Sequence, residues 1–205
     1  MKSGKGGAGQ ILDVAIDLFS TYGYDGVSTT ELANAVGLSQ PNLHYHYGSK
    51  LGLWEAAIHE MIRRIDETSS LDIEELRKMP PVDALKNLFQ PSFFAVQAEL
   101  PEWGRFMQLE GLAGGERLEF IVESIVAQSY DVYIEFIEAG IKQGTIKPYR
   151  PEQILFFMHG ALVNYFNLAP LVEMTFGSSP YDKENSDDYF EMYMDMMFSG
   201  LTVRE

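Results

Sequence analysis

The sequence predicts an all-α protein of about nine helices, with a compact N-terminal three-helix module followed by a larger C-terminal helical bundle. Apolar residues recur at helical spacing along most of the chain, and glycine or proline clusters separate these segments. No segment shows the alternating pattern of a β-strand. A chain of 205 residues is also long enough to bury a substantial core.

Composition excludes several kinds of site. The chain has no cysteine, which excludes disulfides, thiolate zinc sites and cysteine nucleophiles. No apolar run approaches the roughly 20 residues that span a bilayer, and the start of the chain lacks the apolar stretch of a signal peptide. We therefore expect a cytoplasmic protein with no membrane partner. The net charge of −15 argues against a nucleic-acid partner, so that hypothesis needs strong local evidence.

The N-terminal part begins with a glycine-rich arm. Residues 1–9 offer little side chain for packing and predict a flexible segment. From Ile11 an amphipathic helix runs to Gly23, which suits the left-handed residue that ends a helix.

Three further helix starts are marked by capping residues. Ser28 and Glu31 have the spacing of a capping box, and Ser39 can cap a third helix with Pro41 in its first turn. Ser49 can cap a fourth helix. These signals predict a three-helix domain over residues 10–48 and a connecting helix over 49–66.

The second and third helices match the residue pattern of a helix-turn-helix. Counting Thr29 as the first position, apolar or small residues fill the six places at which the two helices and their turn pack, and a glycine occupies the turn. Those six residues are Leu32, Ala33, Val36, Gly37, Leu38 and Leu43.

The third helix has an outer face suited to nucleic acid. Gln40, Asn42, His44 and Tyr45 are polar or amphipathic groups that project away from the predicted core. A purely structural helix corner more often carries glutamate and lysine there. The face therefore favours DNA binding over a structural corner.

The run ILDVAIDLFSTYGYDGVSTTELANAVGLSQPNLHYHYGSKLGLWEAAI resembles the DNA-binding domain of the TetR family of transcriptional regulators. The shared features are the LF, GY and S/T opening, the T-x-x-L-A-x-A-x-G-[LV]-S core, and the aromatic end of the third helix followed by S-K-x-x-L. The resemblance implies a homodimer that binds a palindromic operator in double-stranded DNA. It also implies a small-molecule effector bound by the C-terminal bundle, and a repressor is the expected type of regulator.

Roles for the DNA-binding residues follow from their places and chemistry. Gln40 and Asn42 have amide groups that can contact base edges. Thr30, Tyr45, His46 and Lys50 occupy positions that resemble the family's backbone-clamping residues. His44 departs from the tyrosine common at its position, and its contact with phosphate or base is left open. The complete predicted set is Thr29, Thr30, Gln40, Pro41, Asn42, His44, Tyr45, His46 and Lys50.

Even the N-terminal module is not basic. Residues 1–60 carry three lysines and no arginine, against six carboxylates. Because salt-dependent affinity scales with the number of phosphates that cations neutralise, we expect modest non-specific affinity and a shallow salt slope.

Residues 67–205 are predicted to form a ligand-binding and dimerisation domain. Long helical segments are expected over residues 82–100, 116–143, 152–172 and 186–201. Core packing explains most of their aromatic residues and methionines, but polar groups within such stretches are typical of a small-molecule pocket. A lone histidine such as His159 is more often a hydrogen-bonded core residue. The predicted ligand set is Phe94, Trp103, Phe106, Met107, Tyr130, Tyr133, Phe157, His159 and Asn164.

Two C-terminal segments are candidates for the subunit contact. Residues 154–171 are apolar on more than one face. Residues 189–198 include four methionines, which is more apolar surface than one core stripe requires. The family resemblance also places the dimer contact in this region.

No enzyme constellation or metal site is evident in the sequence. His44 and His46 are two residues apart, which points them to different sides of a helix, and no catalytic motif occurs. We expect neither a cofactor nor catalysis. The alternative function is a helix-turn-helix protein whose acidic surface acts as a protein-interaction module without an effector.

Overall fold

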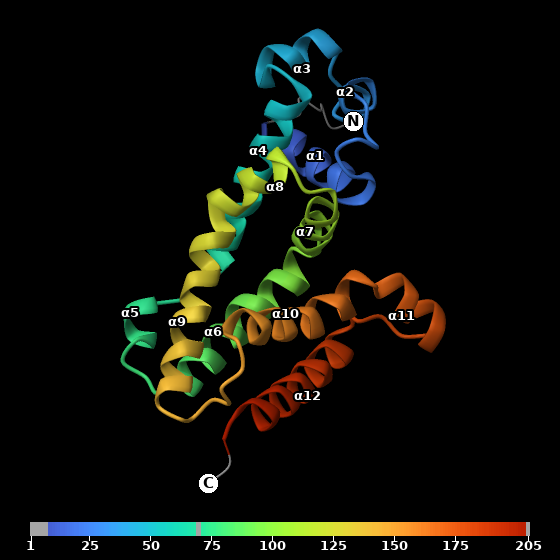
Figure 1. The fold of residues 1–205 in the computed structure, drawn as a ribbon. Coiled ribbons are helices and arrows are strands. Elements are labelled where there is room, and N and C mark those ends of the chain that lie inside the picture. Colours follow the sequence, from blue (N-terminus) through green and yellow to red (C-terminus); the bar gives the residue numbers. More distant parts are fainter. Residues whose placement is uncertain (1–7, 69–70, 204–205) are drawn as a thin grey trace. The chain divides into compact units, whose positions relative to one another are not determined.

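The computed structural model describes residues 8–68 and 71–203, but not the side chains of residues 8, 68 and 91–99. The described chain is helical almost throughout (Figure 1), and its only extended pairing is one antiparallel bridge between Ile146 and Thr202. The all-α prediction is confirmed. In chain order the helices are α1 (Ala8–Tyr22), α2 (Thr29–Ala35), α3 (Gln40–Tyr47), α4 (Lys50–Thr68), α5 (Ile73–Leu76), α6 (Pro81–Glu99), α7 (Pro101–Ala113), α8 (Glu116–Ile121), the π-helical turn η1 (Val122–Val126), α9 (Ala127–Lys142), α10 (Pro151–Asn167), α11 (Ala169–Phe176) and α12 (Lys183–Leu201).

The chain forms two compact units. The first contains the residues up to Glu67 together with Glu102–Ile121, and the second contains Thr68–Pro101 together with the residues from Val122 onward. The sequence suggested one division near residue 66, whereas α7 and α8 belong to the first unit. The reason lies in aromatic packing, because the ring centroids of Phe106 and Phe120 lie 6.0 and 5.8 Å from that of Trp54.

The first unit contains the helix-turn-helix as its sequence pattern predicts. Leu32, Ala33 and Leu43 are buried in its small core. The turn between α2 and α3 passes through Gly37, whose φ of 70° lies in the left-handed region that glycine adopts without steric cost. The Ser28–Glu31 capping box at the start of α2 is present in full, which confirms that prediction.

The predicted flexible arm over residues 1–9 is wrong for its last two residues. Residues 1–7 lie outside the described residues, and Ala8 and Gly9 already belong to α1. The described residues also form more helices than the predicted nine: α5 is an additional single turn, η1 separates α8 from α9 within the helix predicted over 116–143, and the helix predicted over 152–172 is split in two.

That split separates α10 from α11. The sequence predicts one helix over residues 152–172, but α10 ends at Asn167 and α11 begins at Ala169. Pro170 has no amide hydrogen to donate to the Phe166 carbonyl four residues earlier. That carbonyl instead accepts a hydrogen bond from the Tyr181 hydroxyl at 3.2 Å, so the break is stabilised by a side chain from beyond α11.

The core of the second unit lies among α6, α9, α10 and α12. Phe89 of α6 packs against Tyr133 of α9, with their ring centroids 4.9 Å apart. The Tyr193 hydroxyl on α12 donates to the Met158 carbonyl on α10 at 3.2 Å. Aromatic side chains therefore join all four helices of this bundle.

Hydropathy along the helices gives no clear membrane segment. Within residues 8–68 and 71–203, no single helix combines the length and apolar character needed to cross a bilayer. Only α10 and α11 taken together reach that length and composition, and they are bent by 63° at their junction.

Candidate functional site

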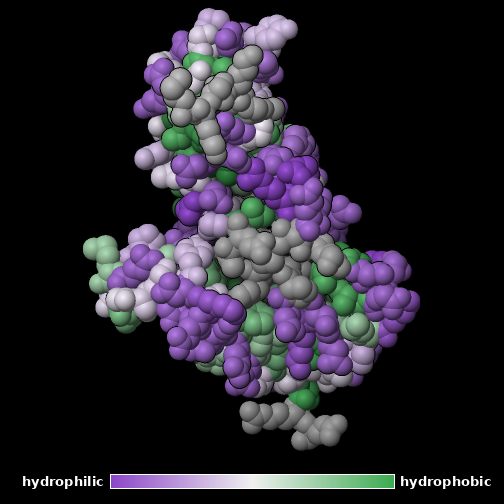
Figure 2. Space-filling model, turned by 180° about the vertical axis from the view of Figure 1, so that it is seen from behind, coloured by the Kyte–Doolittle hydropathy of each residue, from purple (hydrophilic) through white to green (hydrophobic). Residues whose placement is uncertain are grey.

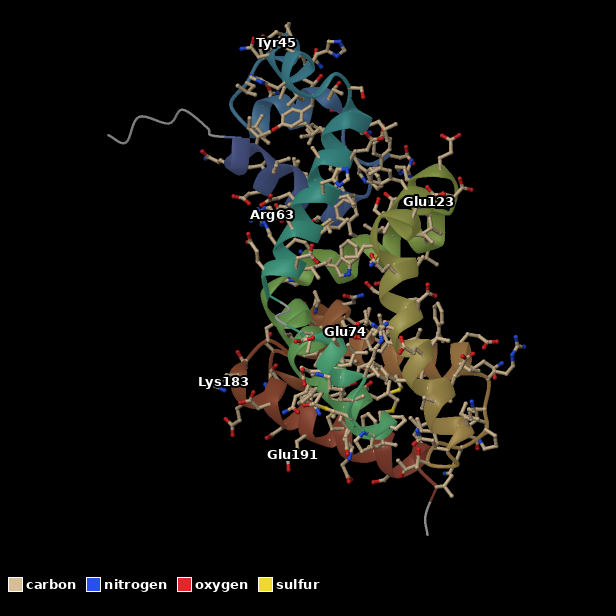
Figure 3. The ribbon with its side chains drawn as sticks, turned by 90° about the vertical axis from the view of Figure 1, so that its left-hand side faces the viewer. Tyr45, Arg63, Glu74, Glu123, Lys183 and Glu191 are labelled. Carbon is tan, nitrogen blue, oxygen red and sulfur yellow. The ribbon has the colours of Figure 1, made fainter. Side chains whose placement is uncertain are left out.

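The exposed face of α3 carries most of the predicted DNA-binding residues. Leu43 points into the core, while Gln40, Asn42 and His44 are exposed. Tyr45 is 85% exposed and extends outward from α3 (Figure 3). Leu43 thus packs α3 against the core, and the polar residues of the helix face the solvent. Pro41 and His46 are exposed as well.

The N-terminal ends of α2 and α3 meet at this surface. The Gln40 Nε2 atom donates to the Thr30 Oγ1 at 2.6 Å and lies 3.4 Å from the Thr29 Oγ1. All three side chains are exposed. The structure therefore brings the predicted base-contacting amide of Gln40 against the Thr30 hydroxyl, predicted to contact the DNA backbone, and close to Thr29, another member of the predicted set.

Lys50 is in a different environment from the α3 residues. It is half-buried, and its Nζ lies 4.2 Å from the centre of the Tyr24 ring. Burial lowers its pKa below the ordinary lysine value, although the nearby Asp25 carboxylate opposes that shift. Lys50 is thus the least accessible member of the predicted DNA-binding set.

Two acidic residues of the first unit are paired within their own part of the chain. Helix α3 itself contains no carboxylate. Glu31 accepts a hydrogen bond from the Ser28 backbone amide at 2.8 Å, and its hydrogen bonds to Ser28 lower its pKa. Glu60 is paired with Arg63 at 2.7 Å and with Arg64 at 2.8 Å. Local pairing therefore reduces the conflict between the acidic chain and a polyanionic partner.

A cluster that the sequence did not predict lies beside Lys50. Arg117 of α8 is 4.4 Å from the Tyr24 ring centre and 2.9 Å from the Glu110 carboxylate of α7. Glu110 is only 2% exposed. Its place four residues after the buried Phe106 puts it on the inner face of α7, and this is the one sequence signal that indicates its burial. We call Glu110, Arg117, Tyr24 and Lys50 the Tyr24 cluster.

In the second unit, three predicted ligand residues lie together. The Nδ1 atom of His159 is 3.2 Å from the Tyr130 hydroxyl, and its ring centroid is 5.6 Å from that of Tyr133. Phe89 also contacts His159, with 6.0 Å between the ring centroids. The structure thus brings these predicted residues of α9 and α10 together.

The other predicted ligand residues are dispersed. Phe106 is 1% exposed and packs with Phe19 and Trp54 in the core of the first unit, where Trp103 and Met107 also lie. They are not part of the His159 group, because α7 packs with the N-terminal helices. Asn164 is exposed, and the side chain of Phe94 lies outside the described residues.

Phe157 lines a surface hollow of about 400 Å³ between α10 and α12. The side chain is 71% exposed, and its neighbours in the hollow are mainly apolar. The remaining lining residues are Tyr149, Gln153, Ile154, Met158, Met196, Met197, Gly200 and Leu201. No group of three histidine, aspartate or glutamate side chains in the described part of the chain could hold a metal ion.

Burial of His159 makes the stability of the second unit depend on pH. Desolvation lowers its pKa from an ordinary 6.5 to about 4. Below pH 6.5 His159 is protonated in the unfolded chain but stays neutral in the folded chain, so the free energy of unfolding decreases as the pH falls toward 4. The shift corresponds to about 3 kcal/mol. Between pH 7 and pH 4.5, we expect the free energy of unfolding of His159→Gln to fall by about 2–3 kcal/mol less than that of the wild type. Urea denaturation at the two pH values measures both changes. Equal losses in both proteins would contradict this account.

Comparison with known proteins agrees with the helix-turn-helix geometry. Residues 11–57 match the model of the family described as bacterial regulatory proteins, tetR family. The chain is 25% identical to the HTH-type transcriptional regulator RutR of Escherichia coli K12, over 95% of this chain and 90% of RutR. It is 39% identical over 49 residues to IcaR of Staphylococcus aureus strain Newman, a negative regulator of the biofilm operon icaADBC. That match covers 24% of this chain and 26% of IcaR.

Solved structures share the fold over nearly the whole chain. The hemolysin II transcriptional regulator HlyIIR is 19% identical, with a TM-score of 0.69 and coverage of 95% of this chain and 96% of that one. AibR, solved with isovaleryl coenzyme A and operator DNA, is 18% identical, with a TM-score of 0.70 and coverage of 92% and 96%. Residues 11–57, which form the helix-turn-helix and its exposed face, thus match the tetR family of bacterial regulatory proteins, and the whole chain is similar to a transcriptional regulator of known sequence.

Proposed function

We propose that this transcriptional regulator is a ligand-responsive repressor that binds a palindromic operator as a homodimer in the cytoplasm and has no enzymatic activity. The observation that carries the proposal is the exposed, carboxylate-free face of α3, held on a helix-turn-helix. Residues 10–48 would bind DNA, 49–66 would connect, and 67–205 would bind the effector and the second subunit. Within that last range, α7 and α8 pack with the first unit.

Exposed apolar residues on α10, α11 and α12 support the dimer. Phe157, Met174 and Met196 are each more than 60% exposed. Figure 2 shows hydrophobic residues at the surface of α11. Large exposed apolar patches mark interaction sites, and a second subunit would bury these side chains. Two recognition helices about 34 Å apart can read successive major grooves, which one helix cannot.

The aromatic group around His159 supports an effector site in the second unit. A neutral imidazole can donate through one ring nitrogen and accept through the other, beside the Tyr130 hydroxyl. Such a group suits an uncharged or weakly polar molecule with one hydrogen-bonding group. An effector that binds one arrangement of the dimer more tightly would shift operator affinity by its differential binding, typically about 1–3 kcal/mol.

A mobility-shift assay on genomic DNA fragments at low salt tests the DNA-binding part of this proposal. We expect the wild type to retain specific fragments and Asn42→Ala to weaken binding by about 5- to 150-fold, the range of one base contact. Tyr22→Ala is the matched control, since Tyr22 is an exposed aromatic of α1 outside the α3 face. If the wild type retains no fragment, the protein-interaction module becomes the better explanation.

A further inference from the structure

The hydrogen bonds of Gln40 restrict how this side chain can meet a base. Its amide nitrogen has two hydrogens, and two hydroxyl oxygens lie near it, at 2.6 Å on Thr30 and at 3.4 Å on Thr29. Both threonines are on α2, and Gln40 is the first residue of α3. The amide nitrogen therefore faces α2, which leaves the carbonyl oxygen Oε1 as the group available to a ligand.

The chemistry of DNA favours the same orientation of the amide. Phosphate oxygens accept hydrogen bonds and donate none, so a threonine hydroxyl that contacts a phosphate must donate its hydrogen to it. The hydroxyl oxygen can then only accept from its other neighbour. If Thr30 holds a phosphate, its Oγ1 needs a donor from Gln40, and only the amide nitrogen supplies one.

We propose that Gln40 contacts the operator bases through Oε1 alone and that Thr30 holds the Gln40 amide in this orientation. This inference rests on the proposed function. An acceptor in the major groove selects an exocyclic amino group, which is N6 of adenine or N4 of cytosine. Guanine and thymine present the acceptors O6 and O4 at the corresponding places and are rejected. The usual pairing of glutamine with adenine differs, because there the amide nitrogen also donates to N7.

The test begins with operators selected from random duplex DNA by the wild type and by Gln40→Ala. The position at which Gln40→Ala alone loses preference identifies the contacted base pair, and every A·T or G·C pair carries one exocyclic amino group in the major groove, on adenine or on cytosine. An unchanged preference in Gln40→Ala would overturn the inference. A wild type that selects no sequence would overturn the proposed function together with it.

Base analogues then separate acceptor-only contact from the two-bond contact. At an adenine position, 7-deazaadenine removes N7 and keeps N6, whereas unsubstituted purine removes the N6 amino group. We expect 7-deazaadenine to change affinity by less than about twofold and purine to weaken it by about fivefold, the size of one hydrogen bond. At a cytosine position, 2-pyrimidinone removes N4 and should weaken binding equally. Equal losses with 7-deazaadenine and purine, or no loss on removing the amino group, would overturn the proposal while leaving specific DNA binding intact.

Variants of Thr30 test its positioning role. Thr30→Val removes the hydroxyl at nearly constant shape and frees the Gln40 amide hydrogen that Thr30 accepts at 2.6 Å, so we expect a new sensitivity to 7-deazaadenine, or a shift toward adenine where cytosine was accepted. Thr30→Ser keeps the hydroxyl and should retain the wild-type pattern. Weaker phosphate contact in Thr30→Val would lower affinity for all sequences alike and would not change base choice. An unchanged pattern of base choice in a folded Thr30→Val variant would show that Thr30 does not position Gln40.

Discussion

Replacing Arg117 with alanine is expected to lower the free energy of unfolding by about 3–5 kcal/mol, because it leaves the Glu110 carboxylate in the core without its cation. Glu110 is almost completely buried, and the Arg117 Nε lies 2.9 Å from its Oε2. The same change removes the guanidinium beside the Tyr24 ring. Chemical denaturation at pH 7, followed by circular dichroism, measures the loss.

The matched control removes an arginine from an exposed ion pair. Arg77 on the surface pairs with Glu135 at 2.9 Å, and both side chains are more than 40% exposed. We expect Arg77→Ala to cost less than about 1 kcal/mol. Replacing both buried partners, as in Glu110→Leu with Arg117→Met, should recover much of the loss, since no unpaired buried charge remains. A cost below 1 kcal/mol for Arg117→Ala would show that the Tyr24 cluster does not stabilise the first unit.

The double substitution Phe157→Glu with Met196→Glu is expected to dissociate the proposed dimer and to weaken operator binding by about 100-fold or more. Both side chains are exposed and line the hollow between α10 and α12. Carboxylates there would have to be buried against the same residues of a second subunit, which is strongly unfavourable. Losing the link between two half-site contacts removes an advantage of about 10²- to 10⁴-fold.

Sedimentation velocity and fluorescence anisotropy with operator DNA measure the two effects together. Leu112→Glu is the control, because Leu112 is an exposed apolar residue of the first unit. It should leave both the mass and the DNA affinity unchanged. A double variant that remains dimeric would place the subunit contact elsewhere, and a wild-type monomer that binds DNA tightly would contradict the dimer proposal itself.

The helix-turn-helix could be predicted closely because its signals are local. Capping by Ser28, the glycine turn at Gly37 and the buried Leu43 each depend on residues within one or two turns of the chain. Leu43 is the buried residue of the short helix α3, so the residues on the other sides of this helix are exposed to solvent. The sequence alone is therefore sufficient to predict this face.

Long-range packing could not be predicted in the same way. The sequence groups Phe106 with the ligand residues because aromatic character alone does not tell which core a helix joins. In the structure, α7 packs with the first unit. The pairing of Glu110 with Arg117 also depends on the turn between α7 and α8. Similarly, the Gln40–Thr30 hydrogen bond depends on the angle between α2 and α3, which residue types do not specify.

The exposed side of α3 is the centre of this account, and site-specific photocrosslinking tests it most directly. A photoreactive phenylalanine analogue at position 45 should crosslink to operator DNA, because Tyr45 extends outward from α3. The same analogue at position 22, on an exposed aromatic of α1, should give little crosslinking. Crosslinking from position 22 but not from position 45, in protein that still binds the operator, would contradict the account.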